Sequence, residues 1–228
     1  PTLLVAALRC LLAETPADLQ APVAMVQQAL QGADPWVHRL AAQVLLAMAE
    51  AGTVADGPLA FGAEFSPVAV LPVRPEFAAA FAGLALQVLE GLSAHGADDP
   101  EADLLRLTAL TLLGREAEAL GDAASLRARW PAERAAALDR HVARIHLANG
   151  SPARALDVLA ASLAREPRSI PGLRLEALAA ARVGDLRRES AALEALVALL
   201  SGSAREVCVF PDAARSEEHT SELQSLRH

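Results

Sequence analysis

Few residues of this chain have a type and spacing suited to binding a metal ion or forming a nucleophile. His141 and His146 lie five residues apart on a predicted helix, whereas two ligands on one helical face lie about four apart. Cys10 and Cys208 match no zinc or redox spacing, so both are expected to be reduced thiols. We therefore predict no metal site and no cofactor, and we expect His146 to be a core residue whose polar nitrogen is hydrogen-bonded.

Two acidic pairs are the remaining candidates for acid–base chemistry. Asp98 and Asp99 precede a predicted helix, and Glu116 and Glu118 stand in the first turn of the next one. Carboxylates at these positions interact favourably with the helix dipole, which explains them without catalysis. The sequence contains no glycine-rich phosphate loop, nucleophile elbow or zinc spacing. These observations predict a protein that is not an enzyme.

Composition and charge argue against two classes of partner. The formal net charge is −8 and every basic residue is an arginine or histidine, because the sequence has no lysine. Such a protein lacks the basic surface that phosphate backbones require, so no nucleic acid is expected as a partner. No apolar run reaches the roughly 18–20 residues of a membrane-spanning helix, so no membrane span is expected. The Ala- and Leu-rich composition without lysine is typical of a GC-rich gene and predicts a bacterial protein. The reduced thiols predict a cytoplasmic one.

Helical periodicity and turn residues divide most of the chain into segments. Residues 1–52 are predicted to be an N-terminal helical segment, truncated because Pro1 already stands inside an apolar run. Prolines and glycines set among apolar residues make 53–75 an irregular but ordered connection, since closely spaced prolines exclude a helix. Helices then recur over 76–202, and residues 203–214 are predicted to be extended.

The C-terminal residues form a further segment. Residues 215–225 resemble the in-frame translation of a sequencing-library adapter. Residues 215–228 are therefore predicted to be a non-native tail without a functional role. A native, charged tail is the alternative.

Glycines and prolines that end helices recur at regular spacing in the region 76–202. Gly150 and Gly184 each end a predicted helix and lie 34 residues apart, and Gly114 precedes Gly150 by 36 residues. Pro131 and Pro167 each follow a turn glycine by 17 residues. A helix-turn-helix unit that recurs at about 34 residues is typical of a helical solenoid.

These residues resemble the tetratricopeptide repeat over about 100–201. Ala119 and Ala155, five residues after their glycines, match the family's small residue. Leucine or histidine stands where the family has large aromatic residues, at Leu173, His146, Leu159 and Leu193. The resemblance implies an all-α fold in which antiparallel helix hairpins stack as a short α-solenoid. An irregular helical array and a bundle without a groove are the alternatives.

The resemblance also implies a concave groove lined by the first helix of each hairpin. Carried over to this sequence, the groove positions include four arginines, namely Arg140, Arg144, Arg174 and Arg182. A guanidinium can bind a carboxylate through two parallel hydrogen bonds, so these residues would hold an acidic peptide or the C-terminus of a partner. The other interpretation is that they form solvated ion pairs on an ordinary helix face.

The sequence thus predicts a non-catalytic protein–protein interaction module that binds a partner protein or peptide, such as an acidic peptide, in a helical groove. The second hypothesis is the helical accessory region of a larger bacterial enzyme, such as a glycosyl- or methyltransferase. Each helix of a predicted hairpin carries a stripe of apolar side chains, and one hairpin cannot bury both stripes without neighbouring hairpins. We therefore also expect apolar surface at the two ends of the stacked hairpins.

Overall fold

A computed structural model describes residues 15–31, 34–53, 77–94 and 99–207. All regular structure in these residues is helical, as predicted, and no strand occurs among them. In order along the sequence the elements are the short 3₁₀-helix η1 (Pro16–Leu19), α2 (Gln20–Leu30), α3 (Pro35–Thr53), α4 (Ala78–Ala94), α5 (Pro100–Leu112), α6 (Glu116–Arg129), the 3₁₀-helix η5 (Ala132–Arg134), α7 (Ala135–Ala148), α8 (Pro152–Arg165), α9 (Ile170–Val183) and α10 (Leu186–Val207).

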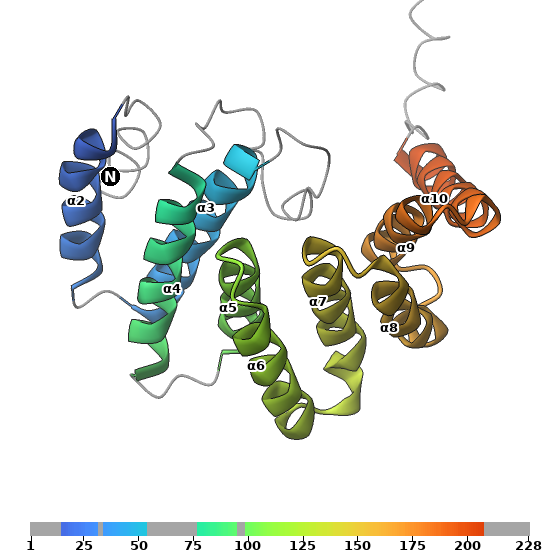
Figure 1. The fold of residues 1–228 in the computed structure, drawn as a ribbon, viewed down its shortest axis with the longest axis horizontal. Coiled ribbons are helices and arrows are strands. Elements are labelled where there is room, and N and C mark those ends of the chain that lie inside the picture. The colour runs from blue at the N-terminus through green and yellow to red at the C-terminus, as the bar shows by residue number, and fades with distance from the viewer. Residues whose placement is uncertain (1–14, 32–33, 54–76, 95–98, 208–228) are drawn as a thin grey trace, which may run out of the picture.

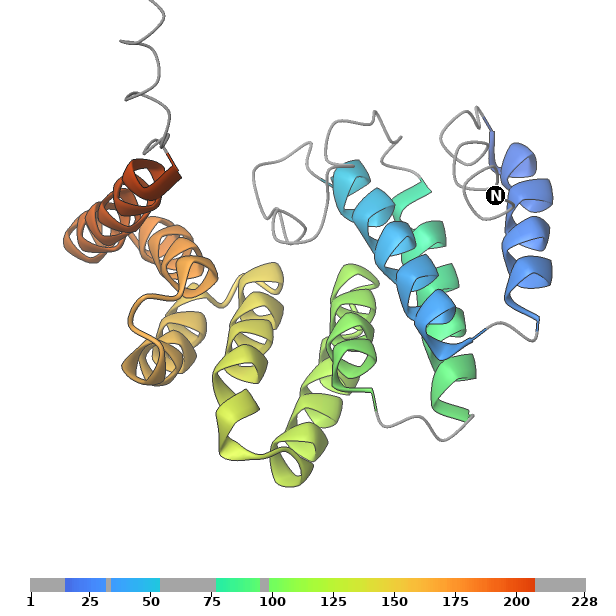
Figure 2. The ribbon, with the colours of Figure 1, turned by 180° about the vertical axis from the view of Figure 1, so that it is seen from behind.

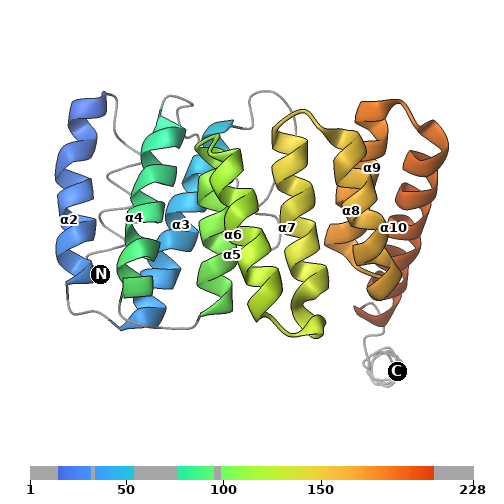
Figure 3. The same ribbon diagram turned by 60° about the horizontal axis from the view of Figure 1, so that its bottom comes forward.

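Helix α2 lies at one end of the molecule, and the pairs α3/α4, α5/α6, α7/α8 and α9/α10 follow one another toward the other end (Figure 1; Figure 3). Helices α3 and α4, α5 and α6, α7 and α8, and α9 and α10 pack in pairs. Each pair also contacts its neighbour, because α4 packs on α5, α6 on α7 and α8 on α9. We call α3, α5, α7 and α9 the first helices of these pairs. Helix α3 contacts α5, α5 contacts α7, and α7 contacts α9. The view from behind shows the same order reversed (Figure 2).

The turns after α5, α7 and α9 share one backbone geometry. Gly114, Gly150 and Gly184 have φ angles of 69°, 66° and 77°, in the left-handed region where glycine is favoured. The amide after each glycine donates to a carbonyl five residues back, at 2.9 Å in Arg115–Leu110, 2.8 Å in Ser151–His146 and 2.9 Å in Asp185–Ala180. The glycines that mark the sequence repeat therefore end three helices by the same hydrogen bonds.

We expect Gly150→Ala to destabilise the fold by about 1 kcal/mol, because alanine is strained at a positive φ. Gly121 is the matched control, since it stands inside α6 with open space where a Cβ would be. Gly121→Ala should stabilise by up to about 1 kcal/mol, as alanine is the better helix former. Urea unfolding of the two variants measures both effects, and equal effects of the same sign would contradict the turn assignment.

Predicted apolar stripes form most of the core. At the start of α4 and along it, the stripe Phe77, Phe81, Leu84, Val88 and Leu92 is buried. Phe77 and Phe81 meet edge to face with ring centroids 6.4 Å apart. In α7 and α8, the predicted Leu138, Ile145, Leu156 and Leu159 are also buried. Helical periodicity thus identified the buried faces correctly in these helices.

The C-terminal boundary of the helical region differs from the prediction. Gly202 was expected to end the last helix, with an extended segment over 203–214. Helix α10 instead continues to Val207, so residues 203–207 are helical. A glycine inside a helix costs only about 1 kcal/mol relative to alanine, and the alanine, arginine and glutamate that follow are compatible with a helix.

Several other predictions concern residues outside the described part of the protein. These are nearly all of the connection 53–75, the remainder of 208–214 and the tail 215–228. Of the helices within the described ranges, none combines the length and the hydropathy that a membrane crossing demands.

Candidate functional site

The four predicted arginines lie on two neighbouring first helices. Arg140 and Arg144 stand on α7, and Arg174 and Arg182 on α9. Helix α7 contacts α9, and α5 contacts α7. The structure therefore places the arginines on adjacent helices of one row, the first helices α3, α5, α7 and α9. We call the surface of this row the first-helix face.

Arg144 is buried, with only 8% of its surface exposed. It interacts electrostatically with Glu50 of α3, which is 7% exposed. Burial raises the pKa of Glu50 to about 8, although the positive charge of Arg144 opposes this rise. Because little of Arg144 is accessible, it is poorly placed to contact a partner directly.

Glu50 is a residue that the sequence did not single out. It lies in the stretch 41–50 of α3, where seven of the ten side chains are buried. The buried side chains there are Ala41, Ala42, Leu45, Leu46, Met48, Ala49 and Glu50. A single acid in such an apolar run is a signal that could have marked it, since glutamate is rarely buried without a partner.

The other three arginines differ in their contacts. Arg140 forms an ion pair with Glu166 at the end of α8, with Nη1 and Oε2 separated by 2.5 Å. Arg182 donates from Nη1 to the carbonyl oxygen of Leu147 at 2.8 Å, which connects α9 to α7. Arg174 is exposed, and no hydrogen bond or ion pair joins its side chain to another described residue. Arg174 is thus the predicted arginine most accessible to a partner.

The two histidines of α7 both have lowered pKa values. No cluster of potential ligands suited to a metal ion occurs among the described residues. Burial, followed by the positive charges of Arg144 and Arg140, holds the pKa of His141 well below its ordinary value. Burial also lowers the pKa of His146. The Nδ1 atom of His146 is buried without a hydrogen-bond partner among the described residues, contrary to the expectation that this nitrogen is satisfied.

Asp139 is the most deeply buried charged residue among those described, at 1% exposure. It lies on α7 and forms ion pairs with Arg127 of α6 and with Arg165 of α8, the latter at 2.6 Å. The hydroxyl of Ser162 on α8 donates to the carbonyl oxygen of Ala136 at 3.1 Å nearby. Asp139 therefore connects three helices electrostatically.

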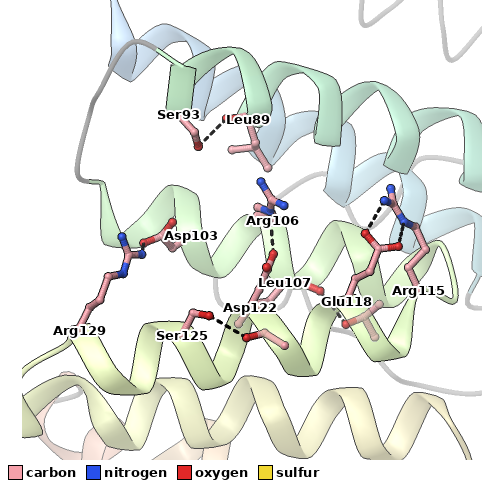
Figure 4. Close-up of polar contacts among 12 residues, drawn as sticks. Leu89, Ser93, Asp103, Arg106, Leu107, Arg115, Glu118, Asp122, Ser125 and Arg129 are labelled. Atoms are coloured by element: carbon pink, nitrogen blue, oxygen red, sulfur yellow. Dashed lines mark hydrogen bonds and ion pairs between the residues drawn. The ribbon is translucent and has the colours of Figure 1, made fainter.

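One of these ion pairs recurs in the preceding hairpin. Asp103 of α5 pairs with Arg129 of α6 at 3.2 Å, as Figure 4 shows. Asp139 and Arg165 stand 36 residues after Asp103 and Arg129, respectively. This interval equals the spacing of the first two turn glycines, so an ion pair repeats with the same period as the turns.

The hairpin α5–α6 carries further polar contacts on its surface. Arg106 of α5 pairs with Asp122 of α6 at 2.8 Å, and Arg115 pairs with Glu118 at 2.6 Å in the turn region (Figure 4). The hydrogen bond to Arg115 lowers the pKa of Glu118. Such exposed pairs are worth little to stability and offer no catalytic geometry.

A shallow apolar cleft of about 430 Å³ opens beside α6. Its lining consists of Leu120, Ala123, Ala124, Arg127, Ala128 and Val142. This lining includes no histidine, carboxylate or hydroxyl, so it offers no acid–base or nucleophilic group. The four predicted arginines do not line it.

Comparison with known proteins found no matching family model, no matching curated protein and no matching solved structure.

Proposed function

We propose that this chain is a non-catalytic protein-interaction module. Helices α3 to α10 form a short α-solenoid of tetratricopeptide-like hairpins, and the first-helix face binds an acidic segment of a partner protein. This function requires no cofactor.

Three observations support the solenoid. Three turns share one left-handed glycine and one hydrogen-bond pattern. The ion pair Asp103–Arg129 recurs 36 residues later as Asp139–Arg165. Each first helix contacts the next first helix, which is the arrangement expected of stacked hairpins that bury their apolar faces against neighbours.

The observation that carries the binding role is the exposure of Arg174. Its guanidinium has no partner among the described residues and lies on the helix next to the one bearing Arg140. A free guanidinium with five donors binds a carboxylate bidentately and with defined geometry. Arg140 already has Glu166, and an incoming carboxylate would have to compete with that residue. Arg144 is buried and interacts electrostatically with Glu50, so it has no direct part in the proposed binding.

The test is a charge reversal at Arg174, measured on an immobilised array of peptides that vary in Asp and Glu content and in a free or amidated C-terminus. The unmodified protein should favour acidic peptides, and Arg174→Glu should weaken that binding at least tenfold while helical circular dichroism stays unchanged. Arg187→Glu is the matched control, because Arg187 is an exposed arginine on α10, outside the first-helix face. Equal losses in both variants, or no preference for acidic peptides, would refute the proposal.

A further inference from the structure

Three hairpins carry a pair of positions in the same register to their turn glycine. One position lies ten residues before the glycine and the other sixteen residues after it. Equivalent hairpins bring the two side chains of such a pair together at the end remote from the turn. The pairs are Leu104 with Trp130, Arg140 with Glu166, and Arg174 with Leu200.

The first two pairs each join residues of matching chemistry. Leu104 and Trp130 are partly buried and pack against the same apolar cluster. Arg140 and Glu166 form the ion pair described above, and their side chains are 18% and 43% exposed. These two positions thus place an apolar residue beside another in α5–α6, and a cation beside an acid in α7–α8.

The third pair is not matched. Arg174 is exposed, and no acid among the described residues pairs with it. Leu200 stands where the second hairpin has Glu166, and it is 54% exposed and offers no hydrogen-bond acceptor in its side chain. The third hairpin therefore has the arginine of the second hairpin without its acid.

The backbone supports the equivalence of positions 166 and 200. Glu166 is the C-cap of α8, whereas Leu200 lies inside α10. The helix that precedes a C-cap residue still places its Cα atom, so both Cα atoms follow the path of a second helix. Helix α10 continues from Leu200 to Val207, which carries the chain about 10 Å further from this position. This direction favours an acid from another molecule.

We propose that Arg174 is an open ion-pair position, in which a glutamate or aspartate side chain of the bound protein takes the place that Glu166 holds beside Arg140. Leu200 leaves this position unfilled, and Glu166 closes the equivalent position on α7 to the partner. The inference rests on the proposed function and adds to it the residue that restricts acid binding to α9.

The first experiment supplies the missing acid from within the protein and needs no partner. In Leu200→Glu the introduced carboxylate should pair with Arg174, as Glu166 pairs with Arg140. NMR titration of isotope-labelled glutamate should give this carboxylate a pKa that is lower by about 0.5 or more than in Leu200→Glu/Arg174→Met, because a neighbouring cation favours the ionised form. Ala191→Glu, at another exposed position of α10, is the matched control and should show no dependence on Arg174.

The second experiment measures binding of fluorescein-labelled hexaglutamate with an amidated C-terminus by fluorescence anisotropy. Leu200→Glu should weaken binding at least threefold relative to Ala191→Glu, which adds the same charge elsewhere. Glu166→Leu should strengthen binding at least threefold by opening the position beside Arg140, and Arg140→Met/Glu166→Leu should lose this gain. Glu194→Leu removes the same charge from an exposed position of α10 and is the control for Glu166→Leu.

The possible results separate this inference from the proposed function. A pKa of the introduced carboxylate that does not depend on Arg174, or equal binding by Glu166→Leu and Glu194→Leu, overturns the inference alone. Absence of hexaglutamate binding to the unmodified protein overturns the proposed function and this inference with it. The inference also fails if binding strengthens when the acids after α10 are replaced by their amides, because the chain's own C-terminal residues then occupy Arg174. These acids are Asp212, Glu217, Glu218 and Glu222.

Discussion

Replacing Arg127 and Arg165 together by methionine is expected to lower the free energy of unfolding by about 3–5 kcal/mol, because it leaves a buried charge without a partner. The charge is that of Asp139, which is 1% exposed, whereas the two arginine side chains are 52% and 47% exposed. The loss of stability therefore comes mainly from the buried carboxylate of Asp139 that is left without a partner, and less from the removal of two half-exposed cations. Urea unfolding at neutral pH measures it.

A rescue experiment separates this mechanism from lost packing of the arginine stems. Adding Asp139→Asn to the double variant removes the stranded charge and should recover a large part of the lost stability. Arg115→Met is the surface control, since the Arg115–Glu118 pair is exposed and should contribute little to stability. A triple variant no more stable than the double variant would show that the buried charge is not the cause.

Glu50→Gln is expected to flatten the dependence of stability on pH above neutrality. The pKa of Glu50 is raised from 4.5 to about 8, so the folded protein holds this proton over a range in which the unfolded protein has released it. The free energy of unfolding therefore falls as the pH rises through this range. Between pH 7 and 9 the unmodified protein should lose about 1.4 kcal/mol relative to the glutamine variant.

The alkaline range isolates Glu50 from the histidines. The pKa of His141 is lowered by burial, so its contribution to stability is present above pH 6.5, its ordinary value, and is lost as the pH falls below that value. Thermal or urea unfolding of both proteins at pH 7, 8 and 9 makes the comparison. Parallel curves for the two proteins would contradict the burial of an uncharged Glu50.

The sequence predicted the elements whose signals are local. Turn glycines such as Gly150 and Gly184 marked helix ends because the left-handed backbone there strongly favours glycine. Apolar periodicity identified the buried stripe of α4. The end of α10 was missed because Gly202 is compatible with both a helix interior and a helix end.

The candidate site was less predictable because burial depends on neighbouring helices. Glu50 and Arg144 stand 94 residues apart in the sequence, and nothing local to either one indicates their electrostatic contact. The groove positions carried over from the repeat family gave the right helices for the arginines. They could not indicate that Arg140 meets Glu166 or that only Arg174 is exposed without a partner among the described residues.

The most direct test of the stacked-hairpin account is the urea-unfolding curve of a variant from which residues 115–150 are deleted. This deletion joins Gly114 to Ser151, two equivalent points of successive turns, and removes one complete period of 36 residues. The account predicts a shorter helical protein that still unfolds in one cooperative transition. Deletion of 115–132, half a period, removes α6 alone and leaves α5 without its paired helix, so it should abolish cooperativity. Loss of the transition in the in-register deletion, or its retention in both deletions, would contradict the equivalence of the hairpins.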